Sequence, residues 1–191
     1  MESAVQHSLT LVEYNQLEEE NQQRYEYYQG EVFAMAGGDP KHGAIASNIL
    51  ALLHNALFDK DCTVFNSDVK FHIESENKSH YPDVSVVCGP AQRSEKDTRA
   101  LINPILLVEV LSDSTAAQDR GSKFHTYSQI DSLQEYVLIE QDIHRAQVFY
   151  RSAPDQRWSM QWYAGEETDV ALQSIGVTFS LSEFYHKTEG L

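Results

Sequence analysis

The sequence predicts an α+β fold, in which a central mixed β-sheet is flanked by helices and extended by extra antiparallel strands. One segment, Lys41–Asp59, has apolar residues at helical spacing, whereas most other apolar segments are short and strand-like. The predicted order is helix, hairpin, long helix, several strands, helix and further strands, which is typical of α+β proteins. The length of 191 residues fits one domain, residues 1–191, with its own core.

The first predicted elements are a short helix and a hairpin. Thr10-Leu11-Val12-Glu13 has the spacing of a capping box, which predicts a helix to about Asn21. Strand-like residues at 25–28 and 31–35 flank Gln29-Gly30, a turn signal, and therefore predict a hairpin. The long helix follows this hairpin.

The middle of the chain contains four predicted strands. The first two lie near Thr63–Phe65 and Asp68–Ile73, and the polar stretch Glu74–His80 is predicted to be a turn. Two more strands, Tyr81–Val87 and Ile105–Leu111, read as sheet core. The segment between them has no apolar period and predicts a loop or a short exposed helix.

The last third of the chain is predicted to start with a helix and to continue mainly as strands. Thr115-Ala116-Ala117-Gln118 again has capping-box spacing and predicts a helix to about Ile130. Three later segments alternate apolar and polar residues as antiparallel strands do; they are 135–139, 146–151 and 159–163. A short helix at 181–185 closes the chain.

The net charge of −15 bears on the choice of partners. It arises from 29 Asp and Glu residues against 14 Lys and Arg residues. A domain of this sign repels nucleic acid, whose binding usually depends on basic patches. The composition therefore argues against tight, non-specific DNA binding but is compatible with binding of a metal ion.

The cysteines and the apolar segments predict a soluble, cytoplasmic protein. Cys62 and Cys88 are far apart in sequence and form no CxxC pair, which predicts a reducing compartment with neither a disulfide framework nor a zinc site. Met1–Ser8 has no signal-peptide pattern. The longest apolar run, around Ile105–Val108, is much too short to span a membrane.

Two carboxylates lie within the predicted core strands. Asp83 and Glu109 are both flanked by residues that otherwise belong to a sheet core. An ionised carboxylate in such a place is costly unless it is paired or binds a metal. Because hard oxygen ligands are what Mg²⁺ and Mn²⁺ prefer, the two acids predict a shared divalent cation.

The residues around this pair carry a family resemblance. Pro82-Asp83 followed by Glu109-Val110-Leu111 resembles the PD-(D/E)xK nuclease motif. Further segments extend the similarity over roughly residues 10–151; they are Tyr25–Glu31, His42-Gly43, Tyr81–Val84, Glu109–Ser112, Asp119 with Lys123 and Tyr127, and Glu135-Tyr136. Taken in this order, the segments resemble the Uma family of predicted restriction endonucleases.

The resemblance implies a restriction-endonuclease-like core and Mg²⁺-dependent hydrolysis of DNA. It implies that Asp83 and Glu109 are metal ligands, that the backbone carbonyl of Val110 is a further ligand, and that Glu31 is an additional acid near the metal. It also implies a lysine beside the attacking water. Restriction-like enzymes often act as symmetric dimers because a duplex has two strands, so we expect a homodimer.

The position of the lysine departs from the motif. Two residues after Glu109, where the motif has lysine, this chain has Leu111. The best replacement is Lys123, which reaches the site only if its helix packs back along the Glu109 strand; Tyr127, one turn later, would then face the same site. The alternative is that Asp119 and Lys123 form an ordinary i,i+4 surface pair.

The sequence leaves alternatives open for the roles of several residues and for the function. His42 either starts the long helix or takes an acid–base role. The late aromatic residues are predicted to pack strands or form an oligomer face rather than a base-stacking platform; they are Tyr150, Trp158, Trp162 and Tyr163. One alternative function is a non-catalytic binding or scaffolding descendant of the nuclease fold. Another is a metallohydrolase for a small phosphate ester.

Overall fold

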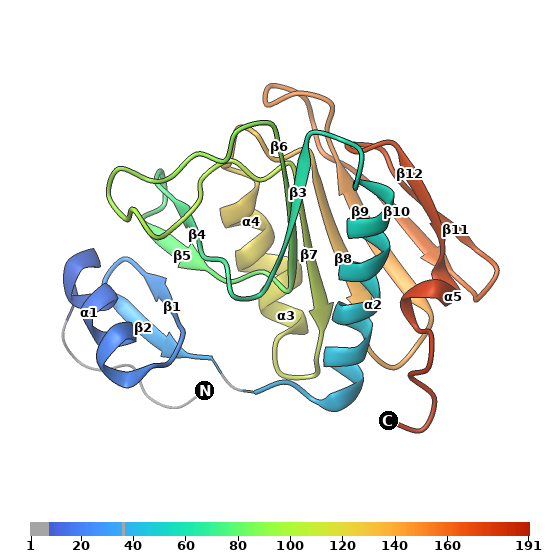
Figure 1. The fold of residues 1–191 in the computed structure, drawn as a ribbon, viewed down its shortest axis with the longest axis horizontal. Helices are drawn as coiled ribbons and strands as arrows, with labels where there is room; N and C mark the ends of the chain where they lie inside the picture. Colours follow the sequence, from blue (N-terminus) through green and yellow to red (C-terminus); the bar gives the residue numbers. More distant parts are fainter. Residues whose placement is uncertain (1–7, 36) are drawn as a thin grey trace.

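A six-stranded mixed sheet with helices on both of its faces forms the centre of the structure (Figure 1). The computed structural model describes residues 8–35 and 37–191, so nearly all of the Met1–Ser8 segment lies outside the described residues. Along the sheet the strands are, in order, β10 (Ser159–Ala164), β9 (Arg145–Tyr150), β8 (Glu135–Glu140), β7 (Leu106–Leu111), β6 (Val84–Cys88) and β3 (Cys62–Asn66). Only β7 and β8 are parallel neighbours. The predicted α+β fold with a central mixed sheet is confirmed.

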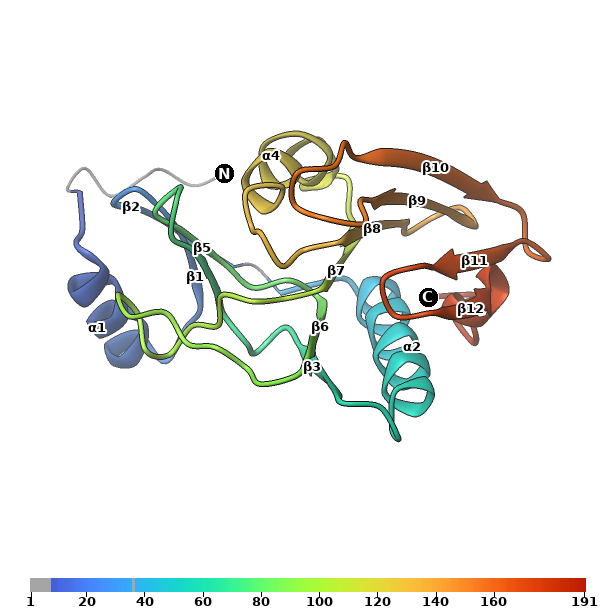
Figure 2. The ribbon, with the colours of Figure 1, turned by 90° about the horizontal axis from the view of Figure 1, so that it is seen from above.

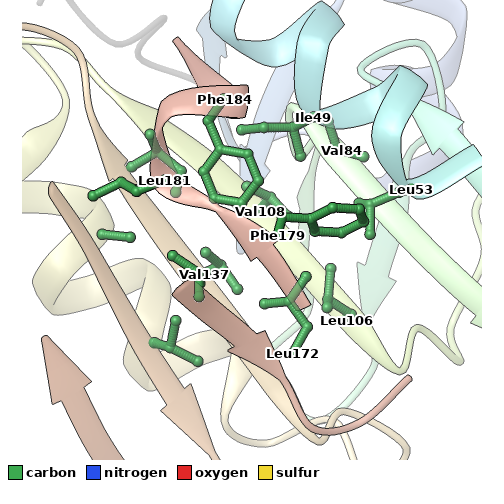
Figure 3. Close-up of a cluster of buried hydrophobic side chains, with 14 of the residues drawn as sticks. Ile49, Leu53, Val84, Leu106, Val108, Val137, Leu172, Phe179, Leu181 and Phe184 are labelled. Atoms are coloured by element: carbon green, nitrogen blue, oxygen red, sulfur yellow. The ribbon is translucent and has the colours of Figure 1, made fainter. Parts of the chain in front are cut away.

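Helix α2 (Pro40–Ala56) covers one face of this sheet. Asp39 accepts a hydrogen bond from the Lys41 N–H at its start, and Pro40 occupies the first helical turn, where no N–H is needed. The predicted helix ran to Asp59, but Leu57 already leaves the helical conformation. The hairpin of β11 (Asp169–Leu172) and β12 (Val177–Ser180), followed by α5 (Leu181–Phe184), closes this core; the packed side chains are drawn in Figure 3.

The opposite face is covered by a helical segment that connects the parallel strands β7 and β8 (Figure 2). It consists of α3 (Ala116–Gln118), a π-helical turn η1 (Asp119–Lys123) and α4 (Phe124–Tyr127). A parallel pair requires such a crossover connection. The predicted capping box at Thr115 is wrong, because the Thr115 side chain caps no helical N–H and instead accepts from the Ser112 N–H.

A smaller sheet lies beside the first, in the order β2-β1-β5-β4. Helix α1 (Leu11–Asn21) begins at the predicted capping box, and the predicted hairpin is confirmed as β1 (Tyr25–Tyr28) and β2 (Glu31–Ala34). Strand β4 is Phe71–Ile73. The predicted turn at 74–80 is partly wrong, since its end forms β5 (Lys78–His80), which pairs with both β1 and β4.

Strand β5 consists of polar residues, so a search for apolar periodicity in the sequence does not detect it. Ser79 and His80 are fully buried, and the Ser79 hydroxyl lies 2.9 Å from the Nδ1 atom of His72. These polar groups are tolerated in the interior because they find partners within the sheet. The hairpin β11–β12 was also absent from the sequence prediction.

The two cysteines of the chain form a disulfide bond, so the prediction that they stay unpaired is wrong. Cys62 and Cys88 are separated by 26 residues, but they are directly opposite each other in the antiparallel pair of β3 and β6. Strand pairing thus creates a proximity that sequence spacing does not reveal. None of the helices within residues 8–35 and 37–191 combines the length and the apolar character needed to cross a membrane.

Candidate active site

Asp83 and Glu109 meet where β6 begins and β7 approaches its end. Asp83 directly precedes β6, and its Oδ2 accepts a hydrogen bond of 2.7 Å from the Val110 N–H on β7. Its Oδ1 lies 3.1 Å from Nε2 of His42, in the first turn of α2. One backbone N–H and one imidazole therefore hold the Asp83 carboxylate beside the Glu109 strand.

The main chain at Val110 faces the same side as Asp83. The ladder of hydrogen bonds between β6 and β7 ends at the pair Val84 and Val108, so Val110 lies beyond it. Pro82, which precedes Asp83, has no N–H that could bind the Val110 carbonyl. In a strand the N–H and C=O of one residue point to the same side, and the Val110 N–H points to Asp83. The Val110 carbonyl is thus directed toward the edge where Asp83 lies.

Glu109 is joined by Lys123 and Tyr127, which the sequence predicted to face the same site. Oε1 of Glu109 is 3.1 Å from the Lys123 ammonium and 3.0 Å from the Tyr127 hydroxyl. Lys123 is also 3.0 Å from Asp119, but both side chains are buried, so the alternative of a surface pair is wrong. The crossover segment does pack back along β7, which brings the lysine to the site.

A second group of buried polar residues supports Lys123 from the smaller sheet. Oε1 of Glu26, on β1, lies 3.3 Å from the Lys123 ammonium and 3.2 Å from Nδ1 of His80 on β5. The other Glu26 oxygen accepts from the Tyr28 hydroxyl at 2.9 Å. Glu26 therefore links the hairpin to the crossover segment.

Glu31 is not brought into this cluster of contacts. It begins β2 opposite Tyr28, with an exposed side chain. Among the described residues Glu26 is the hairpin acid that contacts Lys123. Sequence reasoning missed Glu26, and its only signal was a charged residue between tyrosines in a strand that is otherwise aromatic.

Burial and charge displace the pKa values in this cluster. Burial raises the pKa of Glu109 well above its ordinary value, and the charges of Asp83, Asp119 and Glu26 add to this against the opposing charge of Lys123. Burial disfavours the charged form of Lys123, but the surrounding carboxylates, led by Glu109, raise its pKa well above 10.5. The lysine therefore stays a cation.

Two further groups titrate away from their ordinary values. Burial opposes ionisation of Glu26, yet the hydrogen bond from His80 and the charge of Lys123 lower its pKa to about 2. The hydrogen bond to Asp83 raises the pKa of His42, against the effect of burial. His42 thus lies within the site, in contact with Asp83, rather than merely starting the helix.

The donor set fits a hard divalent cation of the Mg²⁺ type. Three carboxylates, those of Glu26, Glu109 and Asp119, surround the buried Lys123. Asp83 adds its charge beside Glu109, whose pKa is raised first by burial and further by these neighbouring acids. Among the described residues no three His, Cys, Asp or Glu side chains converge as a complete metal cage. Mg²⁺ commonly binds through one or two carboxylates and retains several waters, so a complete cage is not required.

Comparisons with known proteins identify the family of this chain and a solved structure that shares its fold. A family model described as "Putative restriction endonuclease", Uma2, matches residues 11–182. The chain is similar to two uncharacterized proteins of Synechocystis sp. (strain PCC 6803), slr1290 and sll1609. It is 36% identical to slr1290 over 93% of this chain and 91% of that protein, and 34% identical to sll1609 over 85% and 91%.

A solved structure shares the fold. The crystal structure of "a putative nuclease belonging to DUF820" from Anabaena variabilis superposes with a TM-score of 0.68. The alignment covers 86% of this chain and 90% of that chain, at 19% sequence identity. At this identity the likeness establishes the architecture, namely the mixed sheet with helices on its two faces.

Proposed function

Since this chain belongs to the Uma2 family, whose members are described as restriction endonucleases, we propose that residues 1–191 form a single-domain endonuclease that hydrolyses DNA phosphodiester bonds with Mg²⁺ or Mn²⁺. The observation that carries the proposal is the position of Lys123. Its ammonium contacts Glu109 at 3.1 Å although the motif position two residues after Glu109 is a leucine. This contact supports the proposal, because it brings a lysine beside the acids on which such chemistry would depend.

Asp83, Glu109 and the Val110 carbonyl would hold the cation. When bound, such a cation polarises a phosphoryl oxygen and lowers the pKa of a water molecule. In the reaction a water molecule gives up a proton to solvent as its oxygen forms a bond to phosphorus, the bond from phosphorus to the leaving sugar oxygen breaks, and that oxygen takes up a proton. His42 keeps the Asp83 carboxylate in place through its 3.1 Å contact.

Lys123 supplies the fixed positive charge of the site. It is held by carboxylates on both sides, and its raised pKa keeps the proton on the amine. A buried ammonium stabilises negative charge that develops on the phosphoryl oxygens more strongly than it could in water. Glu31 stays a predicted acid of the site, whereas the contacts favour Glu26 as the residue that positions Lys123.

The assembly and the location are parts of the same proposal. A homodimer would place two sites on the two strands of a duplex. A cytoplasmic location would give access to DNA; the disulfide between Cys62 and Cys88 is uncommon in reducing compartments, so cell fractionation is a necessary test of this part.

A cleavage assay with matched variants tests the catalytic proposal. Plasmid and linear DNA are incubated with Mg²⁺, Mn²⁺ or a chelator, using wild type, Asp83→Ala, Glu109→Ala, Lys123→Met and the exposed control Glu20→Gln. We expect cleavage that needs the metal, loss of about 100-fold or more in the first three variants, and no change in the control. Circular dichroism checks that each variant is folded.

The alternative function, a non-catalytic binding or scaffolding module, is favoured by the net charge of −15 and by Leu111 at the position where the motif has lysine. It predicts no metal-dependent cleavage in any preparation. Cleavage that is equal in wild type and in Asp83→Ala would come from a contaminant and would contradict the proposal. Hydrolysis of a model diester without cleavage of DNA would instead indicate a small-molecule phosphodiesterase.

A further inference from the structure

One aromatic residue of the outer strands is not used in packing. Trp162, on β10, is 45% exposed, and its neighbour on the same face, Met160, is 50% exposed. By contrast, Trp158 packs against the core under α4 and Tyr163 is buried on the opposite face. Of the two predicted uses of these aromatic residues, strand packing or an oligomer face, strand packing does not account for the exposed Trp162.

An arginine lies over this tryptophan. The guanidinium carbon of Arg145, on β9, is 5.8 Å from the centre of the Trp162 ring, a cation–π distance. Arg145 is exposed, and it forms no ion pair with any residue within 8–35 and 37–191. Two acids of neighbouring segments, Glu140 and Glu166, contact Arg120 and His144. The Trp162 ring thus holds the Arg145 guanidinium in a position where it is available to bind an external anion.

The strand register aligns this pair with the candidate active site. Glu109 is opposite Leu138 on β8, Leu138 is opposite Gln147 on β9, and Gln147 is opposite Trp162. Directly opposed residues share one face of a sheet, so Trp162 is on the same face as Glu109, three strands away. Three strand spacings amount to about 14 Å. Figure 1 shows these four strands side by side.

Most of the negative charge of the chain lies toward its two ends, where residues 1–40 carry a net charge of −7 and residues 165–191 a net charge of −4. Residues 116–164, from α3 to β10, contain five of the 14 basic residues and six of the 29 acidic residues, a net charge of −1 out of −15. A polyanion is therefore repelled less by this part of the chain than by residues 1–40 or 165–191. Planar guanidinium groups are also well suited to bind phosphate oxygens.

We propose that Arg145 and Trp162 form a contact site for the nucleic-acid strand beyond the point of cleavage, in which Arg145 binds a backbone phosphate and the exposed Trp162 ring, with Met160, contacts a sugar or base. This inference rests on the proposed nuclease function and names where its substrate is held. A separation of about 14 Å is covered by a few nucleotides of either a single strand or a duplex. The phosphate contact of Arg145 would thus locally offset the repulsion between nucleic acid and a protein of net charge −15.

Binding measurements without cleavage test the site. A fluorescein-labelled duplex oligonucleotide is titrated with wild type, Arg145→Ala, Trp162→Ala, Trp162→Phe and the charge-matched control Lys96→Ala, in a chelator and at several salt concentrations. Lys96 is an exposed residue in the loop between β6 and β7, outside the residue 116–164 part of the chain. Anisotropy gives the dissociation constants, and intrinsic fluorescence reports on the two tryptophans of the chain.

We expect Arg145→Ala and Trp162→Ala each to weaken binding about 10-fold. The slope of the logarithm of the binding constant against the logarithm of the salt concentration should become shallower by about 0.9 in Arg145→Ala, because one contact with a duplex phosphate is lost. The slope should not change in Lys96→Ala. Nucleic acid should quench tryptophan fluorescence in wild type, and this quenching should be absent in Trp162→Phe, which retains Trp158.

Three results would overturn the inference. If wild type binds and cleaves while Arg145→Ala and Trp162→Ala bind as Lys96→Ala does, the contact site is wrong although the nuclease function stands. If the two variants change the sedimentation from dimer to monomer and leave the affinity unchanged, the surface is a self-association face. If wild type neither binds nor cleaves nucleic acid, the proposed function fails and the contact site fails with it.

Discussion

The pKa of Glu26 makes a specific prediction about stability and pH. Its folded-state pKa of about 2 is lower than the ordinary value of 4.5, so the unfolded state binds this proton more tightly than the folded state. The stabilisation is therefore fully present above about pH 4.5 and is lost as the pH falls through about 2. A difference of this size corresponds to about 3 kcal/mol in the free energy of unfolding.

Glu26→Gln removes the titration and keeps the size of the side chain. We expect the variant to be less stable than wild type by about 2–3 kcal/mol near neutral pH, because Lys123 loses one of its carboxylate partners. The two stabilities should converge as the pH falls to about 2 and below, where the wild type has lost the same interaction. Urea denaturation at a series of pH values, followed by tryptophan fluorescence, measures both curves.

Glu31→Gln is the matched control, since Glu31 lies on the same hairpin with an exposed side chain. It removes the same charge, and we expect a change within about 0.5 kcal/mol at every pH. A constant difference between Glu26→Gln and wild type across the pH range would refute the reasoning. Equal effects of Glu26→Gln and Glu31→Gln would show that net charge, rather than the contacts of Glu26, sets the stability.

Three further changes test other parts of the structure. Tyr127→Phe removes the hydroxyl that donates to Glu109 and should cost about 1 kcal/mol in urea denaturation; no loss would mean that water replaces the hydroxyl. Glu135→Ala leaves the N–H groups of Gln173 and Ser174 without their acceptor and should cost about 2–4 kcal/mol, and Glu135→Gln, which keeps an acceptor oxygen, should cost less. Reduction of the disulfide, which closes a 26-residue separation, should lower the free energy of unfolding by about 3 kcal/mol. Thiol titration of the native protein should detect no free cysteine, and detection of two would contradict the disulfide.

The fold was predictable where burial follows a simple period. Helix α2 packs one side on the sheet, so its apolar residues recur every three or four positions. Strands β6 and β7 are buried on both faces and appear as continuous apolar runs. Strand β5 was missed because it buries Ser79 and His80 through hydrogen bonds, which no apolar pattern records.

The candidate site was predictable where a charge interrupts an apolar run. Glu109 is conspicuous between valines, and the leucine at the motif position directed attention to Lys123. Glu26 interrupts only a short run of tyrosines, which is a weaker signal, and its role arises from contacts with β5 and with the crossover segment, both distant in sequence. The disulfide is similar, since only the register of β3 and β6 brings its cysteines together.

The π-helical turn η1 lies between Glu109 and Lys123, and it contains one residue more than an α-helix would need there. A turn closed by i→i+5 bonds contains one residue more than an α-helical turn, so loss of one residue there would restore an α-helix. Side chains before the turn would then rotate by about 100° relative to Lys123. Asp119 would leave the site, while Lys123, adjacent to α4, would stay. We expect homologous chains that are one residue shorter in this segment to retain the lysine and to have lost its acidic neighbour.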